Sequence, residues 1–190
     1  RGSITIKLIA TGRQGHVAYF EKALNPLHAL TNLLGDLLKE PLDSGSEHFD
    51  PSSLQITTID TGNTVSNIIP ENTSATINIR YNDQHTEHTI KNWIKSKIVR
   101  CTKKTGAKIE MLETVGAKPF INEPGKFSSI VKNTIETCVG IRPKFSTTGG
   151  TSDARFIQEL CPLVEFGLVG TSMHQIDEYV EIEQIKSFFK

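Results

Sequence analysis

The stretch that decides the fold is Ile4-Thr5-Ile6-Lys7-Leu8-Ile9-Ala10. Its even positions are apolar and its odd positions are largely polar, which is the period of a strand with one buried face. Glycines at positions 12 and 15 then interrupt the pattern within Thr11-Gly12-Arg13-Gln14-Gly15-His16. The sequence therefore predicts a half-buried strand at 4–10, followed by a glycine-rich turn that carries His16.

Outward from this strand, the pattern alternates between strand and helix periods. Asn25-Pro26 is a helix start, with an N-cap and a proline at the first helical position. Leucines at helical spacing follow it until Pro41. Further elements are expected as strands at 54–60, 75–80 and 108–115 and as a helix at 90–101 that ends at Gly106. The order strand, helix, strand, strand, helix, strand predicts a ferredoxin-like four-stranded antiparallel sheet with two helices on one face, an α+β domain over residues 1–115.

Residues 116–190 have a different pattern. We expect a helix at 127–135 that ends at Gly140, a short strand around Phe145, a helix at 156–160, a buried strand at 163–166 and a final helix at 182–189. Fewer than about eighty residues bury a core of their own only with difficulty. We therefore predict that this segment is the incomplete C-terminal part of a larger α/β domain, and the start of the chain at Arg1 suggests a fragment.

Composition excludes several classes of function. The 21 Lys and Arg residues equal the 21 Asp and Glu residues in number, so no excess of positive charge favours nucleic acid or an anionic membrane. The apolar runs are too short to span a bilayer. Cys101, Cys138 and Cys161 lack metal-ligand spacing, and their odd number fits a reducing compartment. We predict small core residues at these positions and a cytoplasmic location.

Three polar residues in the first domain can carry chemistry. His16, with Tyr19 nearby, lies in a glycine-flanked turn and can donate a hydrogen bond to a developing oxyanion, although a solvated loop histidine is the simpler interpretation. Asn67 is either an amide donor for a substrate or a turn residue that serves its own backbone. Arg80, on the polar side of a strand, suits a carboxylate but can equally be an ordinary surface arginine.

The second segment offers glycine-rich backbone at 147–153 and the stretch Ser172-Met173-His174. The glycine-rich stretch can surround a ligand's charge, but it lacks the lysine of a P-loop. Asp153 is either a helix cap or a site residue. A single histidine such as His174 is weak support for a metal, because a catalytic zinc needs about three protein ligands. The His-x-Asp at 48–50 falls in a polar loop, and neither HExxH nor GxSxG occurs.

The order of several motifs is more specific than any one of them. They are Arg1-Gly2-Ser3, Gly15-His16-Val17-Ala18-Tyr19, Asn25-Pro26, Ser66-Asn67-Ile68-Ile69-Pro70, Asn78-Ile79-Arg80-Tyr81, Gly149-Gly150-Thr151-Ser152-Asp153-Ala154-Arg155-Phe156 and His174. In this order they resemble the C-terminal half of bacterial succinyl-diaminopimelate desuccinylases, which belong to a dizinc peptidase and deacylase group that also holds acetylornithine deacetylases. The resemblance covers essentially the whole chain.

The resemblance implies a reaction and its cofactor. Water activated between two zinc ions, which cobalt can replace, hydrolyses N-succinyl-LL-2,6-diaminopimelate to succinate and LL-2,6-diaminopimelate in lysine and peptidoglycan biosynthesis. It also implies a homodimer formed through the first domain, a lid whose His16 serves as the oxyanion donor in the partner's site.

The resemblance implies further roles residue by residue. Asn67, together with Ser66, would reach across the same interface. The remaining assignments would be Arg1, Ser3, Tyr19 and Arg80 around the succinyl carboxylate, Gly149, Gly150 and Thr151 lining the pocket, and His174 on one zinc. Arginine anchors suit a doubly charged acyl group of this kind.

The sequence departs from the family pattern in two respects. The His-x-Asp motif, the bridging aspartate and the acidic zinc ligands of the family belong before Arg1, so we expect this chain alone to hold no dizinc site and to turn over no substrate. Phe20 stands where proline is more usual, and Ser66 where asparagine is common. Two alternatives stay open: an acetylornithine-type deacylase of the same group, and a non-catalytic dimerisation module whose sheet edge pairs with its twin.

Overall fold

The computed structural model describes residues 1–189, with the side chains of residues 114 and 115 left aside. The chain forms two compact units. Unit 1 consists of residues 1–120 together with 147–151, and unit 2 consists of residues 121–146 and the chain from 152 onward. The predicted domain division between residues 115 and 116 stays a prediction.

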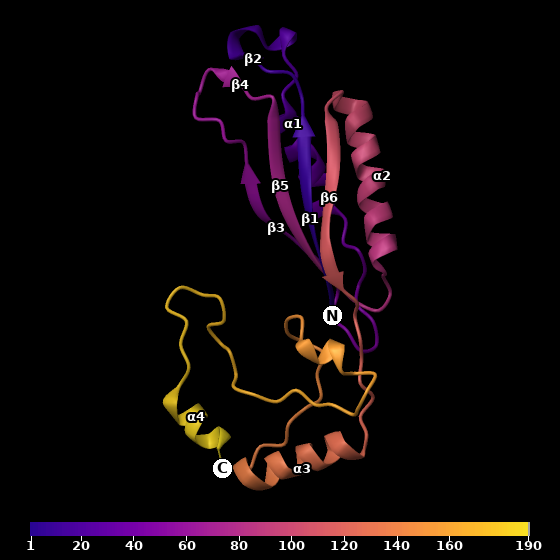
Figure 1. Cartoon of the computed structure of the whole chain (residues 1–190), viewed down its shortest axis with the longest axis vertical. Helices are drawn as coiled ribbons and strands as arrows, with labels where there is room; N and C mark the ends of the chain where they lie inside the picture. Colours follow the sequence, from indigo (N-terminus) through magenta and orange to yellow (C-terminus); the bar gives the residue numbers. More distant parts are fainter. Residues whose placement is uncertain (190) are drawn as a thin grey trace. The chain divides into compact units, whose positions relative to one another are not determined.

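A four-stranded antiparallel sheet forms the centre of unit 1. Its strands are β1 (Gly2–Thr11), β3 (Ser53–Asp60), β5 (Asn72–Tyr81) and β6 (Lys108–Ala117), in the order β3-β5-β1-β6 (Figure 1). β1 and β5 pair without a break from Gly2↔Tyr81 to Thr11↔Asn72. The even-numbered side chains of β1 are fully buried, as their alternation predicted. The ferredoxin-like order of strands is therefore confirmed.

Two helices cover one face of this sheet. α1 (Pro26–Lys39) begins at Asn25, whose Oδ1 accepts a hydrogen bond from the Leu27 amide at 3.0 Å. α2 (Glu87–Thr105) ends at Gly106, which has the left-handed conformation (φ +79°) that glycine tolerates best. Apolar side chains of both helices share one core with those of β1 and β5. A single shared core places both helices on the same side of the sheet, as expected.

Three short elements at one end of the sheet went unpredicted. β2 (Gly15–His16) pairs with β4 (Ile68–Ile69), and the 3₁₀ helix η1 (Val17–Lys22) follows β2 directly. Figure 1 shows them beyond the end of β1 that lies opposite the N-terminus. Two-residue strands carry too few side chains for a period to show in a sequence.

Unit 2 contains α3 (Lys126–Val139), the 3₁₀ helix η2 (Asp153–Phe156) and α4 (Ile182–Phe188). The predicted helix ending at Gly140 is confirmed, with φ +71° at that glycine. The predicted strands around Phe145 and at 163–166 are wrong, because both stretches lack strand structure. A strand needs a neighbour for its backbone hydrogen bonds, and unit 2 offers none within its described residues.

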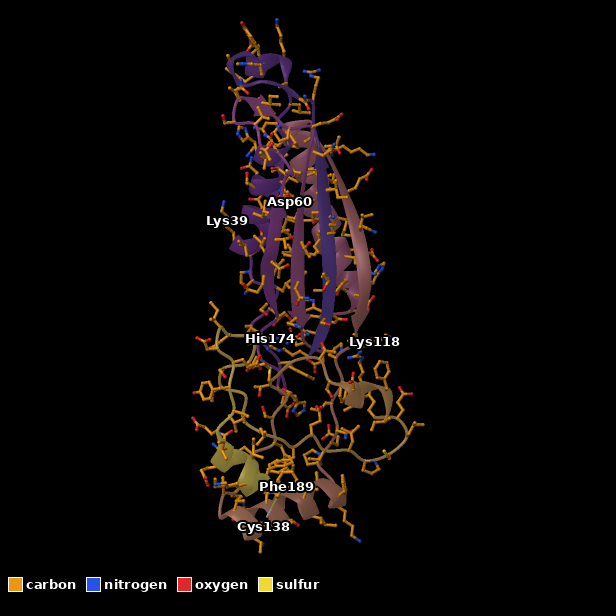
Figure 2. The ribbon with its side chains drawn as sticks, turned by 60° about the vertical axis from the view of Figure 1, so that its left-hand side comes forward. Lys39, Asp60, Lys118, Cys138, His174 and Phe189 are labelled. Atoms are coloured by element: carbon orange, nitrogen blue, oxygen red, sulfur yellow. The ribbon has the colours of Figure 1, made fainter. Side chains whose placement is uncertain are left out.

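Apolar side chains of unit 2 remain largely exposed. None of its described residues belongs to the buried hydrophobic core, and Leu160 keeps 80% of its surface accessible. Cys101 of unit 1 is buried as predicted, whereas the prediction of core positions for Cys138, on α3 (Figure 2), and for Cys161 is wrong because both are exposed. These two cysteines had been assigned to a core that unit 2 does not form.

None of the helices in the described part of the chain has the length and apolar character needed to cross a membrane.

Candidate functional site

Arg80, Ser3 and Thr151 meet at one end of the sheet, and we call them the Arg80 group. The β1–β5 register places Ser3 directly opposite Arg80. Nη1 of Arg80 donates to Oγ1 of Thr151 at 2.5 Å, and this hydroxyl donates in turn to Oγ of Ser3 at 3.2 Å. Three residues that the sequence assigned to substrate binding therefore touch one another, although they are far apart along the chain.

Arg1 adds a second guanidinium to unit 1. Its Nη1 donates to the carbonyl of Pro51 at 3.4 Å, while its Nε is buried without a hydrogen-bond partner among the described residues.

Within residues 1–189, no carboxylate lies at ion-pair distance from Arg80. A half-buried guanidinium without an anionic partner is unfavourable. The two oxygens of a carboxylate ligand can accept two parallel hydrogen bonds from the guanidinium of Arg80.

The segment 147–151 presents Thr151 to this group. Oγ1 of Thr147 donates to the carbonyl of His48, and Gly149 has φ +112°, a conformation that favours glycine. Gly149 and Gly150 are exposed, and a side chain added at either would meet open space. Their predicted role as pocket-lining residues stays a prediction.

His16 lies at the opposite end of the sheet. Its Nδ1 accepts a hydrogen bond from the Ala18 amide at 3.1 Å. A neutral imidazole that accepts at Nδ1 carries its proton on Nε2, so the exposed ring presents one N–H donor outward. The ring of Tyr19 lies 5.9 Å from that of His16. The structure thus places Tyr19 beside His16, as expected from the sequence, while the role of Tyr19 at the succinyl carboxylate, implied by the family resemblance, stays a prediction.

Asn67 and Ser66 lie beside His16 in an exposed turn. The carbonyl of Asn67 accepts a hydrogen bond from the Val17 amide at 3.1 Å, next to the β2–β4 pair. Asn63 shapes this turn, because its side chain donates to the Ile68 carbonyl at 3.0 Å and accepts from the Val65 amide at 3.1 Å. Asn63 therefore serves the backbone of this turn, and both roles considered for the side chain of Asn67 stay predictions. A shallow groove of about 420 Å³ runs along the same turn.

The His16 end and the Arg80 group are separated by the length of β1. This strand contains ten residues, which span roughly 30 Å at about 3.3 Å per residue. Figure 1 shows β2 and β4 at one end of the sheet and the N-terminus at the other. One chain therefore cannot bring both groups to a single small acyl group.

His174 lies in unit 2, in a stretch without helix or strand (Figure 2). It is exposed, has φ +58°, and donates its backbone N–H to Oε2 of Glu178 at 3.4 Å. Asp153 does not cap η2, because Ser152 does so through its hydroxyl. Among the described residues no three His, Cys, Asp or Glu side chains form a group that could hold a metal ion. The described residues therefore do not fit a complete zinc site.

Sequence reasoning missed a buried polar cluster next to the Arg80 group. The Asp43 carboxylate accepts hydrogen bonds from the backbone amides of Gly45 and Ser52, and from the side chain of Asn82. His85 lies 3.0 Å from its other oxygen. Burial alone would raise the pKa of Asp43, but the hydrogen bonds from Ser52, Gly45 and Asn82 together lower it. The one signal in the sequence was Asp43-Ser44-Gly45, a turn motif that predicts loop geometry but no buried charge.

Several curated proteins are similar to this chain in sequence. Succinyl-diaminopimelate desuccinylases of Roseobacter denitrificans and Paracoccus denitrificans are each 46% identical to it, over 97% and 98% of the chain. The chain spans about half the length of these relatives, 49% in both cases.

Solved structures share the fold. A tripeptidase of Staphylococcus aureus superposes with a TM-score of 0.73 at 17% identity, covering 98% of this chain and 48% of its own. The aminopeptidase PepT of Bacillus cereus has a TM-score of 0.70 at 18% identity, covering 98% and 49%. At such identities the likeness concerns the fold alone.

The family model described as "Peptidase dimerisation domain" matches residues 1–104, which is more than half of the chain and includes β1, α1, β3, β5 and all but the last residue of α2. The chain belongs to the peptidase dimerisation domain family.

Proposed function

We propose that this chain is the dimer-forming and carboxylate-binding part of a succinyl-diaminopimelate desuccinylase. The complete enzyme would hydrolyse the amide of N-succinyl-LL-2,6-diaminopimelate, releasing succinate and LL-2,6-diaminopimelate in the cytoplasm. The 46% identity to relatives with this name supports the proposal over nearly the whole chain. The observation that carries it is the Arg80 group, in which the guanidinium donates to the Thr151 hydroxyl, this hydroxyl donates to Ser3, and no carboxylate among the described residues forms an ion pair with Arg80.

The Arg80 group would recognise the free carboxylate of the succinyl chain. An acyl group with a terminal carboxylate can form two charge-assisted hydrogen bonds to a guanidinium, whereas an acetyl group cannot. Arg1 adds positive charge to unit 1, and the Thr151 hydroxyl keeps the Arg80 side chain in place. This chemistry favours a succinylated substrate over an acetylated one.

His16 would act on the scissile amide of the partner's substrate. Attack on the amide carbon places negative charge on the carbonyl oxygen, and a donor aimed at that oxygen stabilises the transition state. The outward Nε2–H of His16 is such a donor. Because β1 separates His16 from Arg80, the two residues at one site would come from two chains, with Asn67 reaching across beside His16.

The proposed enzyme depends on zinc, which would activate water and polarise the amide. The described residues would contribute at most His174 to the metal. In the proposed enzyme the other ligands would lie in the half of the relatives' length that this chain does not match. That half would also cover the exposed apolar side chains of unit 2.

The homodimer would form through the β3 edge of the sheet. β3 and β6 are the two edge strands, and each leaves backbone groups available for pairing. β6 carries Lys108, Glu110 and Glu113, whereas Asp60 is the sole charged residue of β3 (Figure 2). Charged edges resist pairing, so β3 is the edge suited to joining its twin into a continuous sheet.

A chimera tests the proposal directly. This chain replaces the matching half of the Paracoccus denitrificans desuccinylase, and hydrolysis of N-succinyl-LL-2,6-diaminopimelate is compared with that of N-acetylornithine. We expect turnover of the succinyl compound by the chimera and none by the chain alone. Preference for the acetylated substrate would support an acetylornithine-type deacylase instead. A folded, dimeric, zinc-loaded chimera that hydrolyses neither would support a non-catalytic dimerisation module.

A further inference from the structure

A buried polar cluster lies directly next to the Arg80 group along the chain. Asn82 follows Arg80 by two residues, is fully buried, and donates to the Asp43 carboxylate at 2.7 Å. The side chain of Asp43 is only 4% exposed. Such a carboxylate is stabilised when several donors surround it, and Asp43 has four close partners within the described residues: Gly45, Ser52, Asn82 and His85.

The Asp43 cluster closes the loop formed by residues 43–52. The amides of Gly45 and Ser52 both donate to Oδ1 of Asp43, at 2.8 Å and 3.0 Å. Since these two amides lie near opposite ends of the loop, one carboxylate ties the ends together. Asn82 joins the tied loop to the end of β5, because its backbone amide also donates to Oγ of Ser52 at 3.1 Å.

Two carbonyls of this loop hold parts of the substrate-binding region. The carbonyl of His48 accepts a hydrogen bond from Thr147, the first residue of the segment that ends at Thr151. The carbonyl of Pro51 accepts from the Arg1 guanidinium. The loop therefore positions both the segment that bonds Arg80 and the neighbouring cation, although none of its residues was predicted to bind substrate.

We propose that Asp43 is a positioning residue for the Arg80 group. Its buried carboxylate holds the loop 43–52 closed, and the closed loop places Thr147 and Arg1 so that Arg80, Ser3 and Thr151 face an incoming carboxylate together. Asp43 itself touches no substrate. The affinity of the Arg80 group for a carboxylate ligand thus depends on the buried charge of Asp43, which does not contact the ligand. This inference rests on the proposed function of the Arg80 group as a carboxylate-binding site.

A purely structural role for Asp43 makes a different prediction. Such a role would lower the stability of the whole unit without selectively loosening Arg80 or Thr151. A positioning role loosens these side chains while the core stays folded, because their order depends on the loop and not on the sheet. The NMR order parameters of the Arg80 guanidinium and of the Thr151 methyl group distinguish the two roles.

The experiment compares the parent chain with Asp43→Asn, and with Asp36→Asn as the matched control. Asp36 is a partly exposed carboxylate on α1 that pairs with Arg100, so Asp36→Asn makes the same chemical change away from the loop. NMR relaxation of the Arg80 Nε–H and the Thr151 methyl group is measured without ligand. Succinate is then titrated at a temperature at which all three proteins are folded.

We expect Asp43→Asn to reduce the order of both side chains and to weaken succinate binding about fivefold, with Asp36→Asn matching the parent. Unchanged order of Arg80 and Thr151 in a folded Asp43→Asn variant overturns the inference. Failure of the parent itself to bind succinate contradicts the proposed function, while the ligand-free comparison still decides the role of Asp43.

A second variant applies if Asp43→Asn does not fold. Thr147→Val keeps the Asp43 cluster and removes the hydrogen bond to the His48 carbonyl. The same loss of order at Thr151 is expected, since the link from the loop to the segment is cut. If the Thr151 methyl group of Thr147→Val is as ordered as that of the parent, the inference is overturned.

Discussion

Arg80 donates a hydrogen bond to the hydroxyl of Thr151, 71 positions later in the chain, at 2.5 Å. The contact joins the central strand β5 to a glycine-containing segment within the same compact unit. It keeps a guanidinium in place without neutralising its charge, since a hydroxyl is not an anion. The relationship therefore describes an arginine that is ordered and still available to a carboxylate.

Replacing Arg80 tests whether its charge recognises the succinyl group. In the chimera with the Paracoccus denitrificans relative, Arg80→Gln should weaken use of the succinyl substrate about 10-fold to 100-fold, because a charge-assisted hydrogen bond is lost. Arg80→Lys should recover little, since an ammonium lacks the planar fork. Steady-state kinetics with Arg100→Gln as the surface control gives the answer. Equal use of the succinyl substrate by Arg80→Gln and the parent would refute the substrate assignment.

Mixing two impaired chimeras tests whether each site is built from two chains. A dimer of one His16→Ala chain and one Arg80→Gln chain contains one site with both residues intact and one site with neither. Random exchange should therefore restore about a quarter of the parent activity. Activity is measured after the two proteins are unfolded together and refolded. If the mixture is no more active than the average of its two components, both residues act within one chain or the assignments fail.

The edge used for dimerisation can be tested with one matched pair of variants. Ile59 on β3 and Leu112 on β6 are exposed to similar degrees, 52% and 51%. A lysine at position 59 should disrupt pairing of the β3 edges, so Ile59→Lys should be monomeric. Leu112→Lys should remain dimeric. Light scattering over a concentration series distinguishes the outcomes, and a monomer formed only by Leu112→Lys would move the interface to β6.

Asp43 predicts how the stability of the chain depends on pH. The pKa of this carboxyl is lowered in the folded chain, so its ionisation stabilises the fold fully above the unfolded pKa of about 3.9. This contribution is lost as the pH falls from there through the folded pKa. The difference in unfolding free energy between the parent and Asp43→Asn should therefore shrink below about pH 4. Urea unfolding at several pH values measures it, and a constant difference would contradict the prediction.

Most of unit 1 could be predicted because its elements are long and periodic. Ile4, Ile6 and Leu8 repeat every second residue, and the leucines of α1 repeat at helical spacing toward the same core. Asn25 and Gly106 mark helix ends through local chemistry that does not depend on the rest of the fold. The pairing of β2 with β4 depends on residues about fifty positions apart, which no local pattern reports.

The candidate site was predictable as a set of residues but not as an arrangement. Arg80, Ser3 and Thr151 were assigned through family motifs, and the structure brings them together. Tyr19 lies beside His16 because it follows the same turn after β1, and its assignment to the succinyl carboxylate stays a prediction. Asp43 was missed because its burial arises from Asn82 and Ser52, which approach it only in the folded chain.

Unit 2 shows where periodicity misleads. The apolar run at 163–166 predicted a buried strand, yet Phe166 is 54% exposed and the run has no strand structure. An apolar run specifies that a segment prefers to be covered, but a strand forms only when a neighbouring strand supplies hydrogen bonds. The preference of an apolar run for burial can be predicted from the sequence, whereas the presence of a neighbouring strand depends on the whole fold.

The unbroken pairing of β1 with β5 also limits how the protein can change. A single inserted residue in either strand would turn the following side chains to the wrong face of the sheet. Matched insertions of two residues in both strands preserve the facing, and each adds roughly 7 Å. Such paired insertions change the distance between Arg80 and His16 by about 7 Å at a time. The loops, in contrast, can change in length by single residues.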